Sequence, residues 1–367
     1  MNKEQYGKSQ YKGNISEVVL TCESLRKDSD SPMDISLQEF VTKKWGISLD
    51  TLYEDLGINP SSDTIQNIVT LPDTGVRYLI PEIIRDALRL GLRKSPIWQD
   101  IVAAEQTIKN PSVTIPHINM SEATPRYVGE AETIPTGTIS FGSKTLKVRK
   151  IGKGIKIPYE VSQYVAINVV GIFLQDFGVK LNQAIDSLMI DTLINGEQTN
   201  GSESAPVVGI DTIGSVTYRD LLRIWIRMAR LGKTAKIIIG GENAALDTLD
   251  LDEFKKKNSG TTDAKLNLKT PVPDTTNYYI HGSMPSNQQM IIDPSSAIIK
   301  YNAQPLLVET DKIISNQTIE TYASLTTGFG KLFRDAALLM DSSLDFQSGN
   351  GFPSYMEVDT LEDVTIE

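Results

Sequence analysis

The feature that most constrains the fold of this chain is a single long helical pattern between Pro158 and Gly196. Apolar residues recur there at helical spacing on one broad stripe: Val161, Val165, Val169, Ile172, Phe173, Leu181, Ile185, Leu188, Met189 and Leu193. A helix from Pro158 to Ile194 would be about 55 Å long at 1.5 Å per residue. Because a compact domain cannot bury such a helix along its whole length, we expect a strut that crosses the subunit. Gly171 and Gly178 predict a bend or close packing within it.

The stretch just before the helix, Ser121 to Ile157, has the pattern of an extended β-hairpin. Its 37 residues include only 12 apolar ones, with five glycines and two prolines. Polar and apolar residues alternate from Leu146 to Arg149 and from Ile155 to Ile157, as they do in strands. An isolated two-stranded hairpin is marginally stable in water. We therefore expect this hairpin to lie on another surface.

The segments before the hairpin read as an arm, a helix and a strand. The first seventy or so residues are polar, with a short amphipathic piece at Leu37–Trp45, and predict an extended arm or a loosely held accessory segment. Apolar residues recur at helical spacing from Leu79 to Leu88, and Pro81 suits a first helical turn. A strand is predicted at Val113–Ile118.

After Gly196 the pattern is that of an alternating α/β module. The expected elements are strand Val207–Ile210, helix Tyr218–Leu231, strand Lys236–Ile239, helix Glu242–Phe254, and strands Met290–Asp293 and Ile298–Tyr301. Residues 255–277 are polar and turn-rich and predict an exposed loop. Further strands are expected at Thr318–Leu325 and Ala336–Met340, followed by an acidic segment beyond Asp341.

Charge is distributed unevenly along the chain, whose formal net charge is −10. Residues 1–75 hold 7 Lys or Arg against 12 Asp or Glu, and residues 341–367 hold none against 7. Residues 121–157 reverse this balance, with 7 basic residues against 3 acidic ones. Opposite charges on different segments steer docking and fix register between copies of a chain; the alternative is a solvated surface. The candidate contact residues are Arg126, Glu130, Glu132, Lys144, Lys147, Arg149 and Lys150.

Composition excludes several classes of protein. No apolar run approaches the roughly 18 residues that a membrane span needs, and no signal-peptide pattern is present, so we expect no membrane contact. Cys22 is the only cysteine, which excludes an internal disulfide and a thiolate metal cluster.

Four fragments imitate enzyme motifs without the context that the chemistry requires. Gly232-Lys233-Thr234 resembles the end of a phosphate-binding loop but precedes a strand, and Asp73-Thr74-Gly75 has no second copy to complete a carboxylate pair. Gly240-Gly241-Glu242-Asn243 follows a strand and opens a helix, which favours a simple turn and cap. The two histidines, His117 and His281, have no companions at ligand spacing. We assign no catalytic residue, metal or cofactor.

Recognition of a nucleic-acid sequence is not predicted either. The chain is acidic overall, and its basic stretch lacks the interleaved aromatic residues that stack on bases. An acidic chain that formed a container wall would keep packed DNA from adhering to it, because like charges repel.

The order of these segments resembles the major capsid proteins of tailed bacteriophages with the Hong Kong 97-type fold, an α+β class. The most specific stretches are Ala123-Thr-Pro-Arg-Tyr-Val-Gly-Glu-Ala-Glu-Thr-Ile-Pro135, then Phe141-Gly-Ser-Lys-Thr-Leu-Lys-Val-Arg-Lys150, then Pro158-Tyr-Glu-Val-Ser162. They are similar to that family's extended loop and to the start of its spine helix. The resemblance covers the chain from about Leu79 to Met340.

The resemblance also implies a domain layout. It divides the chain into an N-terminal arm or accessory segment (1–78), a helix and lead-in strand (79–120), an extended loop (121–157), a peripheral domain (158–205 and 306–340), an α/β axial domain (206–305) and an acidic C-terminal segment (341–367). In this family the loop lies over a neighbouring subunit. Some members cross-link a loop lysine to an asparagine of another subunit, which would make Lys144 or Lys147 the donor, but most do not.

The function implied by the resemblance is that of a shell subunit. It would form pentamers and hexamers of an icosahedral phage head in the bacterial cytoplasm, with portal and scaffolding proteins as partners and double-stranded DNA packaged without sequence recognition. One alternative is an encapsulin-like nanocompartment that encloses protein cargo. A second alternative is a soluble α/β enzyme centred on residues 207–301.

Overall fold

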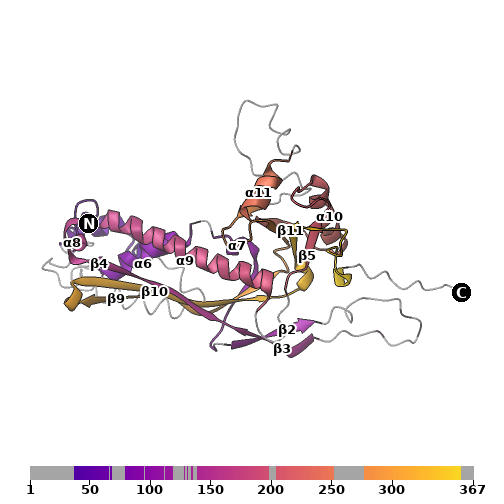
Figure 1. The fold of residues 1–367 in the computed structure, drawn as a ribbon. Helices are drawn as coiled ribbons and strands as arrows, with labels where there is room; N and C mark the ends of the chain where they lie inside the picture. The colour runs from indigo at the N-terminus through magenta and orange to yellow at the C-terminus, as the bar shows by residue number, and fades with distance from the viewer. Residues whose placement is uncertain are drawn as a thin grey trace. The chain divides into compact units, whose positions relative to one another are not determined.

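The computed structural model describes residues 37–65, 67, 79–94, 96–110, 112–118, 128, 130, 134, 139–197, 204–251 and 277–356, and these fall into two compact units (Figure 1). Unit 1 comprises Met1–Pro96, Arg149–Ile185 and Ala303–Thr327. Unit 2 comprises Ile97–Val148, Asp186–Asn302 and Gly328–Glu367. The chain therefore passes between the two units several times, and helix α9 and strands β9 and β10 contribute residues to both.

Unit 1 packs helices on one face of an antiparallel sheet. Its elements are α3 (Leu37–Trp45), α4 (Leu49–Leu56), α6 (Leu79–Leu92), β4 (Arg149–Pro158), α8 (Tyr159–Tyr164), the first part of α9 (Ile167–Asn195), and most of β9 (Ile298–Ile313) and β10 (Thr318–Lys331), with the short 3-10 turn η3 (Ile314–Asn316) between the last two. Strand β10 lies between β9 and β4, and it pairs with β4 from Thr318↔Pro158 to Thr327↔Arg149. The core lies between this sheet and the helices, where Val170, Leu174 and Phe177 of α9 are buried.

Part of the predicted N-terminal arm is folded into unit 1. Residues 37–65 form α3, α4 and a following turn, and Leu37, Val41 and Leu52 are 0–2% exposed in the core. The Leu37 N–H donates to Asp86 of α6 at 2.9 Å. The structure thus differs from the expected loosely held segment, because the short amphipathic pieces bury their apolar sides against α6 and α9. Residues 1–36 lie outside the described part of the chain.

The predicted single long helix is two helices. After α8 the chain turns extended at Val165 (φ −103°, ψ 130°), and Ala166 forms a β-bridge with Thr64 before α9 begins. Helix α9 then runs for 29 residues, about 44 Å, and stops where Gly196 takes a left-handed conformation (φ 74°). The stop at Gly196 was predicted, but the break was not, because Val165 and Ala166 fit the helical apolar pattern.

The close packing predicted at Gly178 is a crossing of two glycines. A Cβ atom on Gly178 would lie 2.2 Å from the Leu88 carbonyl oxygen of α6, and one on Gly91 would lie 2.0 Å from the Gln175 carbonyl oxygen of α9. No atom lies within 4 Å of a Cβ built on Gly171. Helices α6 and α9 therefore approach backbone to backbone at Gly91 and Gly178 only because neither residue has a side chain.

Unit 2 is built around a five-stranded mixed sheet in the order β5-β11-β8-β6-β7. Its elements are α7 (Trp98–Ile101), β1 (Val102–Thr107), β2 (Ser112–Ile118), β3 (Ile139–Lys147), β5 (Val207–Ile210), α10 (Tyr218–Arg230), β6 (Ile237–Gly240), α11 (Glu242–Leu249), β7 (Asn277–Ile280), β8 (Gln288–Ile292), η4 (Arg334–Ala336), β11 (Ala337–Asp345) and η5 (Ser354–Met356). The predicted strands and helices between residues 207 and 292 are confirmed within a few residues, except that α11 ends at Leu249 rather than Phe254. The predicted loop at 255–277 lies outside the described residues, apart from Asn277.

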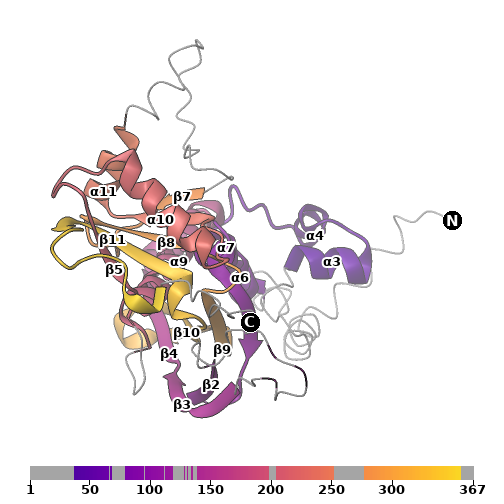
Figure 2. The same cartoon turned by 90° about the vertical axis from the view of Figure 1, so that its right-hand side faces the viewer.

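Helices α10 and α11 cover one face of this sheet (Figure 2). Leu221, Ile224 and Met228 of α10 and Ala245 of α11 share a core with Ile238 and Ile291 of the sheet. Thr217 and Asp220 form a reciprocal capping box that starts α10. The sequence predicted this α/β layer correctly because each element has a strong local pattern.

Strand β11 is an inner strand of the five-stranded sheet, a position that the sequence analysis did not predict. Strand β11 pairs with β8 from Ala337↔Ile292 to Asp341↔Gln288, and with β5 in parallel through Leu339↔Val207. Residues 337–345 were assigned partly to the peripheral domain and partly to an acidic tail, but they are an inner strand of unit 2. Strand β1, which was not predicted, pairs in parallel with the start of β9.

Candidate subunit-contact surfaces

Strands β2 and β3 form a separate two-stranded ribbon in unit 2. They pair from Ser112↔Lys147 to Ile118↔Ile139, with an irregularity between Ile115 and His117. The predicted hairpin had both strands within 121–157, whereas the structure pairs β3 with β2 and gives β4 to the sheet of unit 1. The predicted lead-in strand is thus one arm of the ribbon.

The ribbon is anchored at one end, and two aliphatic side chains described between its strands are exposed. Leu146 is 4% exposed, and a Cβ atom on Gly328 would lie 3.1 Å from Val148 and 3.4 Å from Leu146, so this end packs on the backbone of β10. In the connection between β2 and β3, Val128 is 38% exposed and Ile134 is 70% exposed. These two aliphatic side chains agree with the expectation that the hairpin needs another surface.

The structure places only some of the predicted contact residues. Glu130, Lys147, Arg149 and Lys150 are exposed. Lys144 lies in β3, but its side chain is outside the described set, and Arg126 and Glu132 lie wholly outside it. Contact with a second copy therefore stays a prediction for all seven residues.

Two other basic residues of the same stretch are engaged inside unit 1. Lys156 of β4 forms a 2.7 Å ion pair with Glu320 of β10, and Tyr322 donates a hydrogen bond to the same carboxylate. The hydrogen bond with Lys156 lowers the pKa of Glu320, and the same bond raises the pKa of Lys156. The Lys153 ammonium lies 5.9 Å from the centre of the Phe177 ring. The sequence could not assign these partners because they come from distant segments.

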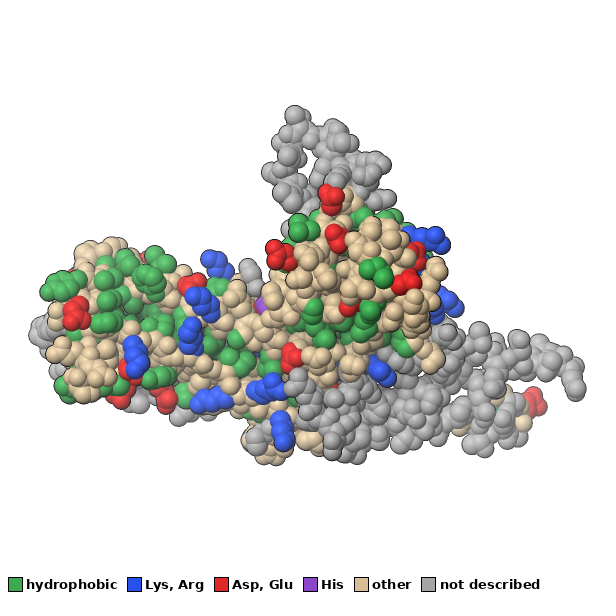
Figure 3. Space-filling model, in the orientation of Figure 1, with side chains coloured by type: hydrophobic (Ala, Val, Ile, Leu, Met, Phe, Trp, Pro, Cys, Tyr) green, Lys and Arg blue, Asp and Glu red, His purple; other side chains and the backbone are tan. Residues whose placement is uncertain are grey.

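Helices α8 and α9 carry an exposed apolar face, although the sequence pattern placed part of it on one stripe with the buried Leu181 and Ile185. Val169, Ile172 and Phe173 of α9 are 43%, 64% and 69% exposed, and Tyr164 of α8 is 81% exposed. Figure 3 shows hydrophobic side chains gathered over this part of unit 1. We call Tyr164, Val169, Ile172 and Phe173 the outer α9 face. The consecutive apolar residues from 169 to 174 were the available signal, because they cannot all point to one side of a helix.

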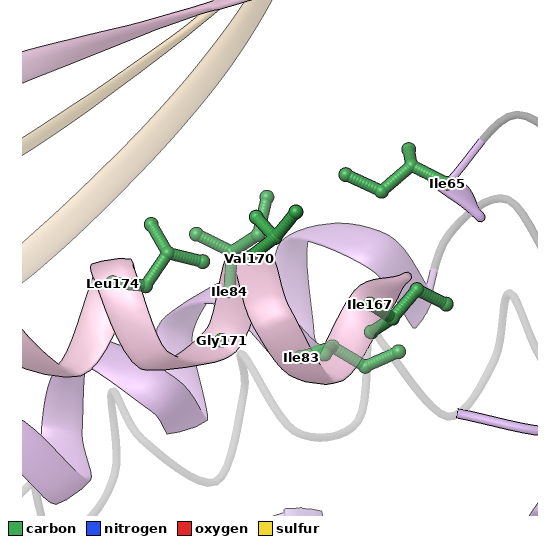
Figure 4. Close-up of a pocket in the computed structure, with 7 residues that line it drawn as sticks. All are labelled: Ile65, Ile83, Ile84, Ile167, Val170, Gly171 and Leu174. Carbon is green, nitrogen blue, oxygen red and sulfur yellow. The ribbon is translucent and has the colours of Figure 1, made fainter. Parts of the chain in front are cut away.

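A shallow apolar hollow lies next to the outer α9 face (Figure 4). It is lined by the residues Ile65, Ile83, Ile84, Ile167, Val170, Gly171 and Leu174. All of its lining side chains are aliphatic, and Gly171 leaves it open where a side chain would otherwise stand. Nothing in this lining could act as a general acid, a base or a metal ligand.

The buried ionisable groups of unit 2 hold elements together. Asp186 of α9 accepts the Trp98 N–H of α7 at 2.9 Å, and the Lys300 ammonium lies 3.1 Å from the centre of the Trp98 ring and 3.7 Å from Glu105. Burial raises the pKa of Asp186 to about 6 and lowers the pKa of Lys300 to about 8. The contacts of both groups are internal, which suits a structural role.

The fragments that imitate enzyme motifs have structural roles where they are described. Gly232 ends α10 in a left-handed conformation, and the Lys233 ammonium lies 3.2 Å from Ser296 and over the Phe333 ring. At the start of α11 the Gly241 N–H donates to Gln288 O, and the Ala244 N–H donates to Ser286 O. Because these amides are occupied, the simple turn and cap is confirmed there.

The histidines and the carboxylates offer no metal site in the described residues. His281 accepts a hydrogen bond from the Ser283 N–H at 3.1 Å, and burial lowers its pKa. The side chain of His117 and the fragment Asp73-Thr74-Gly75 lie outside the described set. No group of three or more His, Cys, Asp or Glu side chains gathers within that set. Nor does any described helix combine the length and apolarity required to cross a membrane.

Comparison with known proteins gives similar structures but no similar sequence. No model of a protein family matches the chain, and no curated protein matches it. The capsid of an empty GTA particle is similar with a TM-score of 0.49 and 13% identity, over 68% of this chain and 90% of that chain. The capsid of the cyanophage P-SCSP1u is similar with a TM-score of 0.47 and 12% identity, over 68% and 88%.

A virus-like particle from Pyrococcus furiosus is similar with a TM-score of 0.45 and 10% identity, over 71% of this chain and 98% of that chain. All three come from capsids or virus-like particles.

Proposed function

We propose that this chain is a major capsid protein, which self-assembles into the pentamers and hexamers of an icosahedral phage head around double-stranded DNA. The observation that carries the proposal is the outer α9 face. Helix α9 buries Val170, Leu174 and Phe177, and next to them it exposes Val169, Ile172 and Phe173. A helix whose apolar surface extends beyond the side that its own subunit covers is typical of one that a further surface covers.

The free energy that the outer α9 face could contribute to one contact between two copies is small. Burying one large apolar side chain contributes about 1.5–3 kcal/mol, and the side chains of the outer α9 face are already partly covered. One such contact falls short of the roughly 8 kcal/mol of a micromolar complex. A closed assembly, in which each copy makes several contacts at once, gains from each of them. The ribbon and the exposed basic residues of β3 and β4 are further contact surfaces under this proposal.

The rest of the proposal concerns partners and location. The subunits would assemble in the cytoplasm of a bacterial host with scaffolding and portal proteins, and the virion would be their final location. The net charge of −10 would limit adhesion of packaged DNA to the wall. An encapsulin-like shell would use the same contact surfaces as a phage head, and the two shells would differ in what they enclose. Nuclease-protected DNA in particles from the natural source supports the phage head, and an enclosed protein would support the alternative.

The outer α9 face is tested by the double substitution Ile172→Ser and Phe173→Ser. Because both side chains are exposed in the single subunit, we expect the variant to keep its circular dichroism spectrum and its unfolding midpoint, and to lose assembly in light scattering. Ile280→Ser in unit 2 is a control, since Ile280 is likewise an exposed aliphatic residue, at 54%. Particles formed at the wild-type yield by the double variant would contradict the proposal, and so would a variant that unfolds, because the face would then be covered within the subunit.

A further inference from the structure

Helix α10 presents a basic face on the side that points away from its sheet. Leu221, Ile224 and Met228 are buried against the sheet. On the opposite side, Arg219, Ile226 and Arg230 are exposed, with Ile226 50% exposed. Their spacing of seven and four residues places them on one side of a helix. We call these three residues the basic α10 face.

Two other arginines of α10 are engaged within the subunit. The Arg223 guanidinium lies 2.7 Å from Asp211 and 3.2 Å from Asp220. Arg227 stacks at 4.4 Å over the ring of Phe352, in the segment that follows β11. Arg223 also lies 4.3 Å over the ring of Phe346, so both arginines pack the segment after β11 against α10. The basic α10 face takes no part in that internal network of contacts.

Helix α11 presents the opposite pattern. Ala244, Ala245 and Thr248 are buried against the sheet. On the other side, Glu242, Leu246 and Asp250 are exposed at intervals of four residues, with Leu246 62% exposed. Figure 3 shows acidic side chains over α11. We call these three residues the acidic α11 face. Each face thus has one exposed aliphatic residue between two charges, and the charges of the two faces are opposite.

Helices α10 and α11 lie on the same side of the sheet of unit 2. Ile224 of α10 and Ala245 of α11 share one core with Ile238 of the sheet. Thr248 of α11 donates a hydrogen bond to Gln289 of β8, and Tyr278 of β7 shares that acceptor. Since both helices cover the same side of the sheet, their outer faces both point away from it (Figure 2).

We infer that the basic α10 face of one copy docks on the acidic α11 face of a second copy. The aliphatic residues would pair at the centre, and the charges would surround them, as in protein interfaces with an apolar core and a polar rim. Because both faces lie on the same side of the sheet, two copies related by a two-fold axis make the contact twice, with each basic α10 face on the acidic α11 face of the other copy. The inference rests on the proposed function and deepens it by naming a contact that would join copies of the chain.

Helix dipoles favour only two of these four charges. Glu242 lies in the first turn of α11 and Arg230 in the last turn of α10, where each is favourable, whereas Arg219 near the start of α10 and Asp250 at the C-cap of α11 are not. If helix dipoles alone explained the charges, each paired reversal would leave both the stability and the assembly of the subunit nearly unchanged. The two accounts therefore predict different results for reversed faces.

Paired charge reversals test the contact. One variant carries Arg219→Glu and Arg230→Glu, and a second carries Glu242→Arg and Asp250→Arg. At physiological salt, each should raise the protein concentration needed for half-assembly, followed by mass photometry, by at least about tenfold, because like charges would then face each other. The control is Lys236→Glu, which reverses an exposed charge at the start of β6 and should assemble as the wild type does.

Two rescue experiments make the result specific. A chain that carries all four reversals has the original net charge and should assemble again, since its faces are exchanged. An equimolar mixture of the two variants should also assemble, because each contact then joins one copy of each kind.

The outcomes separate this inference from the proposed function. Wild-type levels of assembly in both reversed variants, or impairment that neither rescue restores, would overturn the α10–α11 contact while the wild type still forms shells. Failure of the wild type itself to assemble would overturn the proposed function.

Discussion

At the scale of single residues, the least expected feature is the buried Asp186. Its carboxylate fixes the start of α7 by accepting backbone N–H groups, yet burial raises its pKa to about 6. Unlike the charged residues of the ribbon, it gives no signal in the sequence, because its surroundings come from α7 and β9. The sequence shows which segments are charged, but it does not show which charged side chains the fold buries.

Asp186 makes the stability of the subunit depend on pH. Its pKa is about 6 in the folded chain against a usual value of 3.8, so protonation favours the folded state. The stabilisation is complete below about pH 4 and is lost as the pH rises through 6, with a full size on the order of 2–3 kcal/mol. Asp186→Asn keeps an oxygen acceptor for Trp98 and removes the titration.

We therefore expect the wild type to lose stability relative to Asp186→Asn between pH 4 and pH 7 in urea unfolding. Groups that both proteins share cancel in this difference. Parallel stability curves over that range would contradict the assignment.

At the scale of secondary-structure elements, local patterns were predicted well and long-range pairings were not. The bounds of β5 and the start of α10 and α11 agree with the sequence analysis, because caps, apolar periodicity and β-branched runs are local signals. The pairing of β3 with β2, the passage of β4 into another sheet and the inner position of β11 all depend on segments far apart in the sequence. Likewise, the stripe on α9 was visible, but its division into a buried and an exposed face was not.

The glycine crossing of α6 and α9 gives a test with an internal control. Gly178→Ala places a methyl group 2.2 Å from the Leu88 carbonyl oxygen, so the helices must separate. Overpacking of this kind costs about 1–3 kcal/mol, which exceeds the roughly 1 kcal/mol that alanine gains over glycine in a helix. We expect a lower unfolding free energy for Gly178→Ala by denaturant titration.

Gly171→Ala is the matched substitution on the same helix. A Cβ atom at Gly171 meets no atom within 4 Å, so only the gain in helix propensity remains and the unfolding free energy should rise by up to about 1 kcal/mol. Equal changes at the two positions would show that α6 and α9 do not cross at Gly178 in solution.

At the scale of the whole molecule, the chain has more outward-facing contact surface than a single subunit uses. The outer α9 face, the aliphatic residues between β2 and β3, and the oppositely charged faces of α10 and α11 come from separate segments of the chain. Each would be a solvated or aggregation-prone surface in a lone protein, and each would be a contact surface in the proposed assembly of identical copies. The sequence indicated assembly through the stretch 121–157, which has too few apolar residues to fold by itself, and through the opposite charges of that stretch and the chain's ends.

The account is tested most directly by measuring the mass and the shape of the particles that the purified chain forms. Mass photometry over a range of protein and salt concentrations, combined with negative-stain microscopy, separates lone subunits from rings and closed shells. We predict pentamers, hexamers or closed shells in the megadalton range. A chain that stays a monomer or a dimer under every condition would contradict the proposed shell function and would favour the alternative of a soluble α/β enzyme.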